Sequence, residues 1–596
     1  MAVHDGQPEG RGLNFYLVDT DLQDILRHSL SPEQYRRAEP LLTRMGELSG
    51  GPIDRQAEYT DRLARPVLET YDRQGNVVNE VRYNPLYEES VREVYGLGTI
   101  GCSYGQDPLP YAVHFALLYL LSESDPGLAC PVTLTASTAY VLARHGDEEQ
   151  RACHLPLLAV REEGPFADGA TFVTEKQGGS DAGLATTEAR PVPAEELAGA
   201  RAAFGPGSGQ LVRLYGEKWF ASNADADLAL VTARPPGAAD GTRGLGLYLM
   251  PRRLADGSAN AYRIRRLKDK LGTTGLATGE LELDGALAEL VTAAPDGFKH
   301  MLEALEFSRI ANAAASAGIH RRVYLEAKLY AEGRRAFGAP LAEHSMVQQT
   351  IVTMLAELHA STALAFEAAR ALDAATGNPD APAVAWHRLT TALAKYRTGE
   401  LAVRNASRAI EVLGGNGYVE EYVTARMYRE AQVLPVWEGP ANIQALELLR
   451  TLEPRWRSDL VMKGRVADAA AAAAGDERSR EMADILRARW QEAEAAIDWL
   501  RQHPEAAQEH ARRLIDFLSE ILEFTLVLED ALRELKAGNE RGLVLAWWLG
   551  RLYLAPRPAH GLQEDISWLA PIYRRLTDAE PVSGVRLPGL SVEVGI

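Results

Sequence analysis

A change of hydrophobic pattern near Gly169 is the feature that most constrains how this chain can fold. Before this point, from about residue 31, apolar residues recur at the spacing of helices. Beyond it, as far as about Leu290, short alternating runs separated by Gly and Pro predict strands. Helical spacing returns at about Asp296 and resumes after Pro454. The order of regions is therefore helical, β, helical and again helical.

The individual elements follow from the same two periodicities. Helices are predicted over residues 108–122, 133–145, 148–160, 303–332, 344–376 and 382–413. Strands are predicted over residues 211–215, 228–233, 245–250 and 279–283. At Ser31-Pro32-Glu33-Gln34, a serine N-cap and a glutamine placed for a capping box predict a helix start. We expect Gly50-Gly51 to end that helix.

A length of 596 residues favours three or four structural units over a single core. The expected units are an N-terminal helical domain (1–169), a β-domain (170–292), a helical bundle domain (293–453) and an extra C-terminal helical domain (454–596). The fold class is therefore α+β and mostly α. In the last unit, Ala546-Trp547-Trp548 together with Trp568 and Tyr573 is typical of core packing.

The charge of the chain bears on its partners. A formal net charge of −19 argues against a nucleic-acid partner, because phosphate binding needs clustered positive charge. Residues 455–596 alone carry 19 Lys and Arg against 23 Asp and Glu, a net charge of −4. No run of about 18 uninterrupted apolar residues occurs, so no membrane span is expected. Residues 111–121 are expected to form a buried core helix instead.

The cysteines and histidines predict neither a disulfide framework nor a metal site. The three cysteines have no CxxC spacing, which fits a protein of the reducing cytoplasm. Residues 1–12 lack the apolar core of a secretory signal. His320, His344 and His359 lie on helical stretches without other ligands at metal spacing, so structural or surface roles are expected for them.

Thr174-Glu175-Lys176-Gln177-Gly178-Gly179-Ser180-Asp181 is the first candidate for ligand binding. Gly-Gly-Ser lets the backbone approach a ligand closely, and hydroxyl side chains can bond phosphates or ring heteroatoms. The segment is neither a P-loop nor a dinucleotide-binding fingerprint, because the Gly-Lys-Ser/Thr and GxGxxG patterns are missing. Taken alone, it fits a polar turn between domains better than a ligand site.

The second candidate is Gly216-Glu217-Lys218-Trp219-Phe220-Ala221-Ser222-Asn223. Adjacent aromatic residues in a strand lie on opposite faces. One ring could pack in the core while the other stacks on a planar ligand, with the Ser222 hydroxyl nearby. A strand with one buried aromatic residue is the simpler alternative.

Glu438 is the candidate for chemistry. It follows Val433-Leu434-Pro435-Val436-Trp437 and immediately precedes Gly439-Pro440, where a helix should begin. A carboxylate in an apolar pocket has a raised pKa, which suits a general base. The alternative is an acidic residue stabilised by a helix N-terminus.

Together these segments resemble the acyl-CoA dehydrogenase family. TEKQGGSD, GEKWFASN, RRAFGAPL (residues 334–341), GGNGY (414–418) and WEGPANIQ (437–444) occur in the family's order and at about its separations, and the resemblance covers residues 90–452. The TEKQGGSD and WEG variants, and Cys130-Pro131-Val132-Thr133, are most similar to the branch that contains the alkylation-response flavoprotein AidB. The resemblance implies a helical domain, a β-barrel and a four-helix bundle, with FAD between barrel and bundle.

The resemblance also implies site residues. Thr174, Gly179 and Ser180 would contact the flavin, and Phe220 and Ser222 match the aromatic-x-hydroxyl pair beside its ring. Arg334 and Phe337 would reach the cofactor of a neighbouring subunit, which implies a homodimer or homotetramer. The adenine half would lie near the glycines of GGNGY, and Asn442 would bind near the flavin phosphates. The implied cofactor-binding glycines of that motif are Gly414, Gly415 and Gly417.

The implied reaction is α,β-dehydrogenation of an acyl thioester such as an acyl-CoA. Glu438 would remove the α-proton while the β-hydrogen leaves as hydride to flavin N5, and the Glu438 backbone N–H would stabilise charge on the thioester carbonyl. Glu306 and Arg309, with Ser180 and Gly439, match substrate-pocket positions. Electrons would pass to an electron-transfer flavoprotein.

Two residues depart from this pattern, and one other function competes with it. Phe220 replaces the Trp of many relatives and still offers an aromatic face. Pro440 stands where relatives commonly have Thr near the flavin phosphates, which puts the efficiency of ordinary β-oxidation chemistry in question. The competing function is an AidB-like flavoprotein with a DNA-associated protective role, which the acidic C-terminal region disfavours.

Overall fold

The computed structural model describes residues 8–556 and 565–590, and in it the chain forms two compact units. One unit comprises residues 36–311, and the other comprises residues 1–35 together with 312–596. We call them the barrel unit and the bundle unit, and describe each by itself. The first seven residues of the segment expected not to be a secretory signal lie outside the described range.

The predicted helix start at Ser31 is confirmed, and the predicted stop is wrong. Gln34 N–H donates to the Ser31 hydroxyl (3.2 Å) and Ser31 N–H donates to the Gln34 side chain (2.9 Å), which is a capping box at the start of α2 (Pro32–Leu48). Gly50-Gly51 does not end the helical path. A π-helical segment (Ser49–Ile53) carries the chain directly into α3 (Asp54–Leu63).

The helical part of the barrel unit is built around two buried helices. Every residue of α5 (Tyr111–Ser122) except Tyr111 is buried, as predicted for a core helix. By length and composition α6 (Pro126–His145) could cross a membrane, but 89% of its apolar window is buried inside the structure. Asp125 caps α6 through the Leu128 N–H, and α6 packs on the sheet, where the Thr135 hydroxyl accepts from Gly169 N–H (2.8 Å). The other helices are α4 (Pro85–Gly96) and α7 (Glu148–Leu158).

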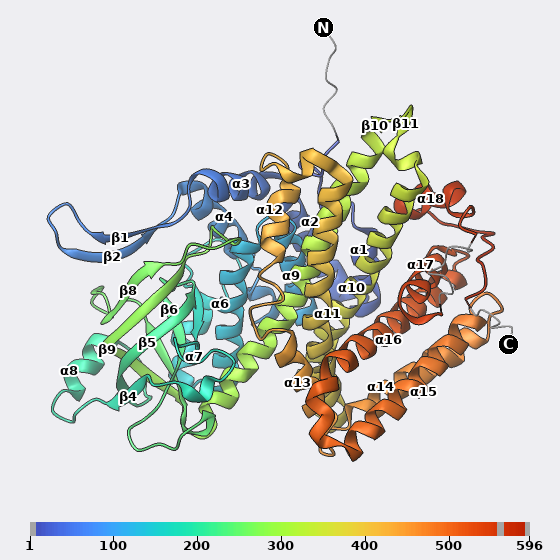
Figure 1. The fold of residues 1–596 in the computed structure, drawn as a ribbon. Coiled ribbons are helices and arrows are strands. Elements are labelled where there is room, and N and C mark those ends of the chain that lie inside the picture. Colours follow the sequence, from blue (N-terminus) through green and yellow to red (C-terminus); the bar gives the residue numbers. More distant parts are fainter. Residues whose placement is uncertain (1–7, 557–564, 591–596) are drawn as a thin grey trace, which may run out of the picture. The chain divides into compact units, whose positions relative to one another are not determined.

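Seven strands form the barrel. Their order is β3-β6-β7-β9-β5-β4, with β8 paired to β9, and every pair is antiparallel except β3 with β6. A bridge between Glu188 and Arg234 joins β4 to the chain after β6 and curls the sheet round an apolar core. Figure 1 shows the strands in green. Their bounds are β3 (Gly169–Phe172), β4 (Glu188–Pro191), β5 (Leu211–Ser222), β6 (Leu228–Ala233), β7 (Gly246–Pro251), β8 (Tyr262–Leu267) and β9 (Thr278–Thr292).

Two elements of the barrel unit depart from the sequence prediction. The N-terminal region, predicted to be mainly helical, contains a hairpin of β1 (Val67–Tyr71) and β2 (Val77–Arg82). The predicted β-domain contains a helix, α8 (Leu197–Phe204), whose Ala200 and Phe204 pack on the outside of the barrel with Leu211 and Leu287.

The bundle unit is built on long helices. α9 (Gly297–Gly333) enters it from the barrel unit, and it is followed by α10 (Ser345–Gly377) and α11 (Ala381–Leu413). Their Ala- and Leu-rich sequences favour helix, and Asp380 caps α11 by accepting from Ala383 N–H (2.8 Å). α12 (Val423–Ala431) and α13 (Ala441–Thr451) complete this part, and α1 (Thr20–Ser29) packs on α10. The chain therefore has the predicted fold class.

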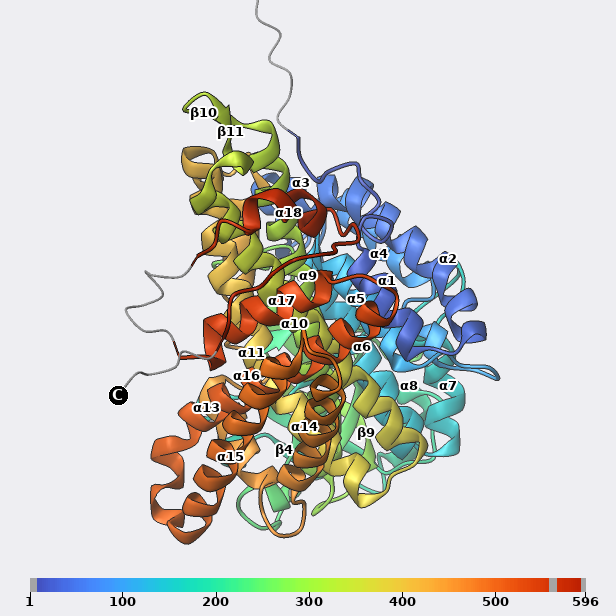
Figure 2. The ribbon, with the colours of Figure 1, turned by 90° about the vertical axis from the view of Figure 1, so that its right-hand side faces the viewer.

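The extra C-terminal helices pack on this bundle in the same unit (Figure 2). α16 contacts α10, α11 and α13, and Arg397 of α11 forms a buried ion pair with Glu523 of α16 (2.9 Å). Trp547 and Trp548 are buried, as predicted, and Trp548 donates to Thr353 of α10 (3.0 Å). The helices of this region are α14 (Ser458–Ala474), α15 (Arg480–Gln502), α16 (Ala507–Lys536), α17 (Arg541–Leu549) and α18 (Leu569–Thr577).

Candidate functional site

The loop after β3 is organised by one carboxylate. Glu175 accepts hydrogen bonds from the backbone N–H of Thr186 (2.7 Å) and from the hydroxyl of Thr187 (2.6 Å). Trp219 N–H donates to the Thr174 carbonyl (2.9 Å), which holds the loop beside β5. The TEKQGGSD segment is therefore fixed against the strand that carries Phe220, so the structure brings the first two sequence candidates together.

A buried cation accounts for the position of Glu175. Lys218 Nζ lies 2.9 Å from Glu175 Oε1 and also donates to the Thr232 carbonyl (2.9 Å), and both charged side chains are almost fully buried. Burial raises the pKa of Glu175, but the charge of Lys218 and the bond from Thr187 outweigh it and lower the pKa to about 2. Glu175 is therefore ionised at neutral pH and keeps the loop closed on β5.

The aromatic pair of β5 is arranged differently from the prediction. Neither ring is buried in the barrel core: Phe220 is 58% exposed and Trp219 is partly exposed, whereas the neighbouring Lys218 is buried. A register shift between Lys218 and Ala221 alters the simple alternation of faces. Lys268 Nζ lies 3.9 Å from the Trp219 ring centroid and 4.5 Å from that of Phe220. Ser222, at the end of β5, lies 3.4 Å from the Thr278 hydroxyl.

The remaining groups of this loop suit a planar, phosphate-bearing ligand. A Cβ on Gly178 would meet Asp181 O at 2.4 Å, so that glycine is required by the loop itself. At Gly179 a Cβ would meet only Thr174, and the Gly179 and Ser180 residues are exposed. An exposed aromatic face, side-chain hydroxyls and an accessible glycine backbone are donors and surfaces that fit a flavin.

Glu438 lies in a tight turn of the bundle unit that two side chains hold. Both Glu438 and Gly439 have positive φ angles, 57° and 94°, and an αL conformation is costly for a residue other than glycine. Gln444 donates to the Glu438 carbonyl (3.1 Å) and to the Gly439 carbonyl (2.9 Å). The buried Lys395 of α11 donates to the Gly439 carbonyl (2.8 Å). The buried lysine thus holds a strained turn, and this turn fixes the backbone position from which the partly buried Glu438 side chain extends.

Helix α13 begins directly after this turn. Pro440 is its N-cap residue and makes no side-chain capping hydrogen bond. Asn442 lies exposed in its first turn. An uncapped helix N-terminus presents backbone N–H groups and favours anions. Pro440 carries no hydroxyl, and the backbone N–H groups of the first turn of α13 follow it directly.

Arg334 and Phe337 belong to an exposed hairpin at the end of α9. The hairpin pairs β10 (Arg335–Ala336) with β11 (Ala339–Pro340), and its turn residues, Phe337 and Gly338, have φ angles of 51° and 88°. Phe337 is 97% exposed, and Arg334 is also exposed. The hairpin presents both side chains to solvent within this single chain.

The glycines after α11 lie near this hairpin's helix. Gly414 ends α11 with a φ angle of 63° and, like Gly415, is exposed. A Cβ on Gly417 would meet Ile410 O at 2.7 Å, so this glycine allows a close backbone contact. Asn416 donates to the Tyr330 hydroxyl (3.1 Å) and joins the segment to the last turns of α9.

The predicted substrate residues Glu306 and Arg309 share one face of α9 within the barrel unit, three residues apart, and Arg309 is the more buried of the two. Sequence reasoning missed Lys218, Glu175 and Lys395 as organising residues. Glu175 lies in the TEKQGGSD motif and Lys218 in the GEKWFASN motif. The two residues are 43 positions apart, so their ion pair is visible only in the fold.

Comparisons with known proteins agree with these features. Residues 6–162 match the adaptive response protein AidB N-terminal domain, residues 170–286 the acyl-CoA dehydrogenase middle domain and residues 295–453 the acyl-CoA dehydrogenase C-terminal domain. The chain is 33% identical over 454 residues to acyl-CoA dehydrogenase family member 11 of Caenorhabditis elegans, covering 73% of this chain and 70% of that protein. It is 32% identical over 397 residues to AidB of Escherichia coli (strain K12), covering 65% and 69%.

Among solved structures, Caenorhabditis elegans ACDH-11 in complex with C11-CoA is similar, with a TM-score of 0.82, 27% identity, and coverage of 92% of this chain and 93% of that chain. This chain belongs to the acyl-CoA dehydrogenase family, in its AidB-like branch. The predicted resemblance and fold class are thereby confirmed. The family assignment also confirms FAD as the predicted cofactor.

Proposed function

We propose that this protein is an FAD-dependent acyl-CoA dehydrogenase that oxidises the α,β-bond of an acyl thioester with Glu438 as the catalytic base. The observation that carries the proposal is the turn at Glu438. Its strained backbone is held by Gln444 and Lys395 through the two carbonyls of Glu438 and Gly439. Such restraint suits a carboxylate that must meet one substrate proton in a fixed geometry.

Different residues of the chain would bind different parts of the FAD molecule. Phe220, Ser222 and the Thr174–Ser180 loop would hold the flavin ring, while the N-terminus of α13 and Asn442 would bond its phosphates. Bound FAD supplies the two-electron acceptor for the hydride that leaves the β-carbon. Glu438 takes the α-proton on its carboxylate, and its backbone N–H stabilises the charge on the thioester carbonyl.

The substrate class is an acyl-CoA. Support comes from the family and from the ACDH-11 relative, whose structure contains C11-CoA. Glu306 and Arg309 are the residues of this chain that we propose for the substrate pocket, with Ser180 and Gly439. An electron-transfer flavoprotein would take up the electrons after each turnover, and the exposed Arg334 and Phe337 would complete the cofactor site of a second copy in a homodimer or homotetramer. The protein is proposed to act in the cytoplasm.

The AidB-like alternative is a flavoprotein with a DNA-associated protective role. The match of residues 6–162 to the AidB N-terminal domain is the observation in its favour. The net charge of −4 over residues 455–596 weighs against it, because a duplex would need a basic surface there. Salt-sensitive retention of DNA by the full chain, with no acyl-CoA oxidation, would select this alternative.

The direct test is anaerobic titration of the purified, flavin-loaded protein with acyl-CoAs of different chain length and branching. We expect at least one of them to bleach the flavin absorbance, and Glu438→Gln to slow this bleaching by about 10²–10⁴-fold while the FAD content is kept. If no acyl-CoA bleaches the wild-type flavin, the proposed dehydrogenase activity is wrong. The acyl-CoAs that bleach the flavin then show which acyl-chain lengths and branching patterns the protein accepts.

A further inference from the structure

Three potential metal ligands meet where two helices of the barrel unit come together. His145 is the last residue of α6, and His300 and Glu303 occupy the first turns of α9. One ligand atom from each of the three lies within 4.8 Å of the others. His300 and Glu303 share one face of α9 because they are three residues apart. His145 lies 158 residues before Glu303 in the sequence. The cluster therefore has no short ligand spacing by which the sequence would reveal it.

The three side chains lie close enough together for their ligand atoms to reach a single ion. His145 Nε2 lies 2.9 Å from Glu303 Oε2, and the imidazole rings of His145 and His300 are stacked with centroids 3.5 Å apart and planes 7° apart. A tetrahedral Zn²⁺ with bonds of about 2.0–2.1 Å keeps its ligand atoms about 3.3 Å apart. An imidazole nitrogen offers its lone pair in the plane of its ring, so one of the two stacked rings would turn out of the stack for all three atoms to surround one ion.

Two features of the surroundings favour metal binding. The Thr292 hydroxyl lies 2.9 Å from His300 Nδ1, which fixes the ring and leaves its other nitrogen for a metal, as partner groups do for ligating histidines. The C-terminus of α6 carries the negative end of its helix dipole, which favours a cation at His145.

One neighbour opposes binding. Arg144 Nε lies 3.1 Å from Glu303 Oε2 and competes for the same carboxylate oxygen that contacts His145. The guanidinium is 40% exposed and can turn into solvent, whereas His145 and Glu303 are largely covered. Arg144 should therefore weaken metal binding without preventing it, and its removal should tighten the site.

We propose that His145, His300 and Glu303 form a Zn²⁺ site that fastens the end of α6 to the start of α9. Two imidazoles and one carboxylate suit Zn²⁺ better than Mg²⁺ or Ca²⁺, which prefer all-oxygen ligands. A water molecule would fill the fourth position, since the cluster keeps access to solvent. The site is independent of the proposed dehydrogenase activity.

The test uses the full-length, flavin-loaded protein freed of metal with a chelator and titrated with Zn²⁺, with Co²⁺ absorption reporting the ligand set. We expect one ion per chain, binding at least tenfold weaker in His300→Ala and in Glu303→Gln, and several-fold tighter binding in Arg144→Ala. His28→Ala, which removes an exposed histidine of α1, is the matched control and should bind as the wild type does.

Folding of each variant is checked by its circular dichroism and its FAD content. Zn²⁺ should raise the thermal midpoint of the wild type and leave that of His300→Ala unchanged. The proposal is overturned if neither ion binds the wild type, or if a His145→Ala/His300→Ala variant that keeps its circular dichroism binds Zn²⁺ as the wild type does.

Discussion

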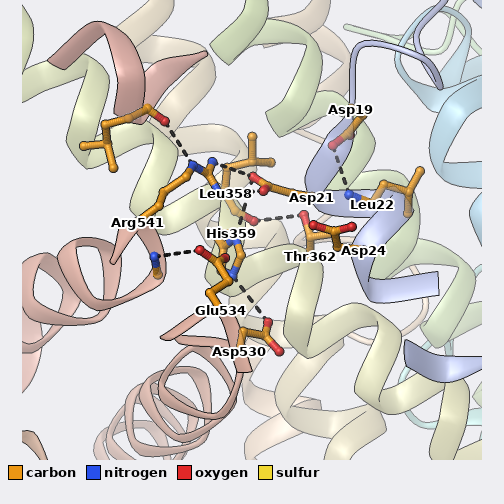
Figure 3. Close-up of polar contacts among 12 residues, drawn as sticks. Asp19, Asp21, Leu22, Asp24, Leu358, His359, Thr362, Asp530, Glu534 and Arg541 are labelled. Atoms are coloured by element: carbon orange, nitrogen blue, oxygen red, sulfur yellow. Dashed lines mark hydrogen bonds and ion pairs between the residues drawn. The ribbon is translucent and has the colours of Figure 1, made fainter. Parts of the chain in front are cut away.

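Arg541 of α17 holds Asp21 of α1 through two hydrogen bonds, Nη1 to Oδ1 at 2.7 Å and Nη2 to Oδ2 at 3.0 Å, although the two residues are 520 positions apart. Figure 3 shows the pair with His359 of α10, whose two ring nitrogens lie 3.6 Å from Asp21 and 3.3 Å from Asp530. Burial raises the pKa of Asp21, but the charge of Arg541 and the bond to His359 outweigh it and hold the pKa well below its usual range. The N-terminal helix, the bundle and the C-terminal helices are thus joined by one buried charged cluster.

Replacing Arg541 with Ala should strongly destabilise the protein. Asp21 would stay buried without its main counter-charge, and breaking a buried ion pair typically costs about 3–5 kcal/mol. Chemical denaturation followed by circular dichroism measures the loss. The exposed pair Arg27–Asp24 provides the control, since Arg27→Ala should change the unfolding free energy by about 0–1 kcal/mol. Equal effects of the two substitutions would show that the cluster does not join these helices.

The Glu175–Lys218 pair predicts a pH dependence of stability. Because the pKa of Glu175 in the folded protein is about 2 and that of an unfolded Glu is about 4.3, its stabilisation is complete above about pH 4.3 and is lost as the pH falls toward 2. Glu175→Gln should therefore lower the thermal midpoint at pH 7, and the gap to the wild type should narrow between pH 5 and 3. A difference in thermal midpoint that stays constant between pH 5 and 3 would contradict an ionised Glu175 paired with Lys218.

Lys395 should matter for turnover through the turn that it holds. Lys395→Met removes the bond to the Gly439 carbonyl and frees Glu438 to move, and a displacement of about 1 Å can cost on the order of 10²-fold in rate. We expect kcat to fall while FAD content is unchanged. Lys463→Met, which removes a half-exposed lysine paired with Glu494, is the control and should leave kcat unaltered. Unchanged turnover in Lys395→Met would contradict the proposed role of Lys395 in positioning Glu438.

Phe337 should act between copies of the chain. Its ring is 97% exposed, so Phe337→Ala removes little burial from the single chain and should not lower its unfolding free energy. If the ring reaches the cofactor site of a second copy, FAD retention on dilution should fall. Met346→Ala, at a residue that is 81% exposed and close in sequence, serves as the control. Identical FAD retention in both variants would argue against that role.

Local signals in the sequence predicted local structure well. The capping box at Ser31 needs only four adjacent residues, and the long helices of the bundle repeat their pattern over many turns. The hairpin of β1 and β2 was missed because Val67, Tyr71 and Val77 are all exposed, so no alternation marks the strands. Its turn signal, Asp72 accepting from Gln74 and Asn76 N–H, was present.

The candidate site was predictable only in part, because its supporting contacts join residues that are far apart in the sequence. Motifs in the sequence predicted candidate ligand-contacting residues, such as Phe220 and Glu438. They could not identify the residues that hold them, because Lys218 and Lys395 act through partners 43 and 44 positions away. A buried lysine in a strand also contradicts the expectation that an aromatic residue fills the core.

The central claim is that the Glu438 carboxylate removes a proton from an acyl thioester, and stopped-flow measurement of flavin bleaching tests it most directly. Wild-type protein mixed anaerobically with a reactive acyl-CoA should bleach rapidly. Glu438→Gln should bind the same acyl-CoA and FAD but bleach about 10²–10⁴-fold more slowly, as expected for loss of a general base. Bleaching by Glu438→Gln at the wild-type rate would contradict the claim.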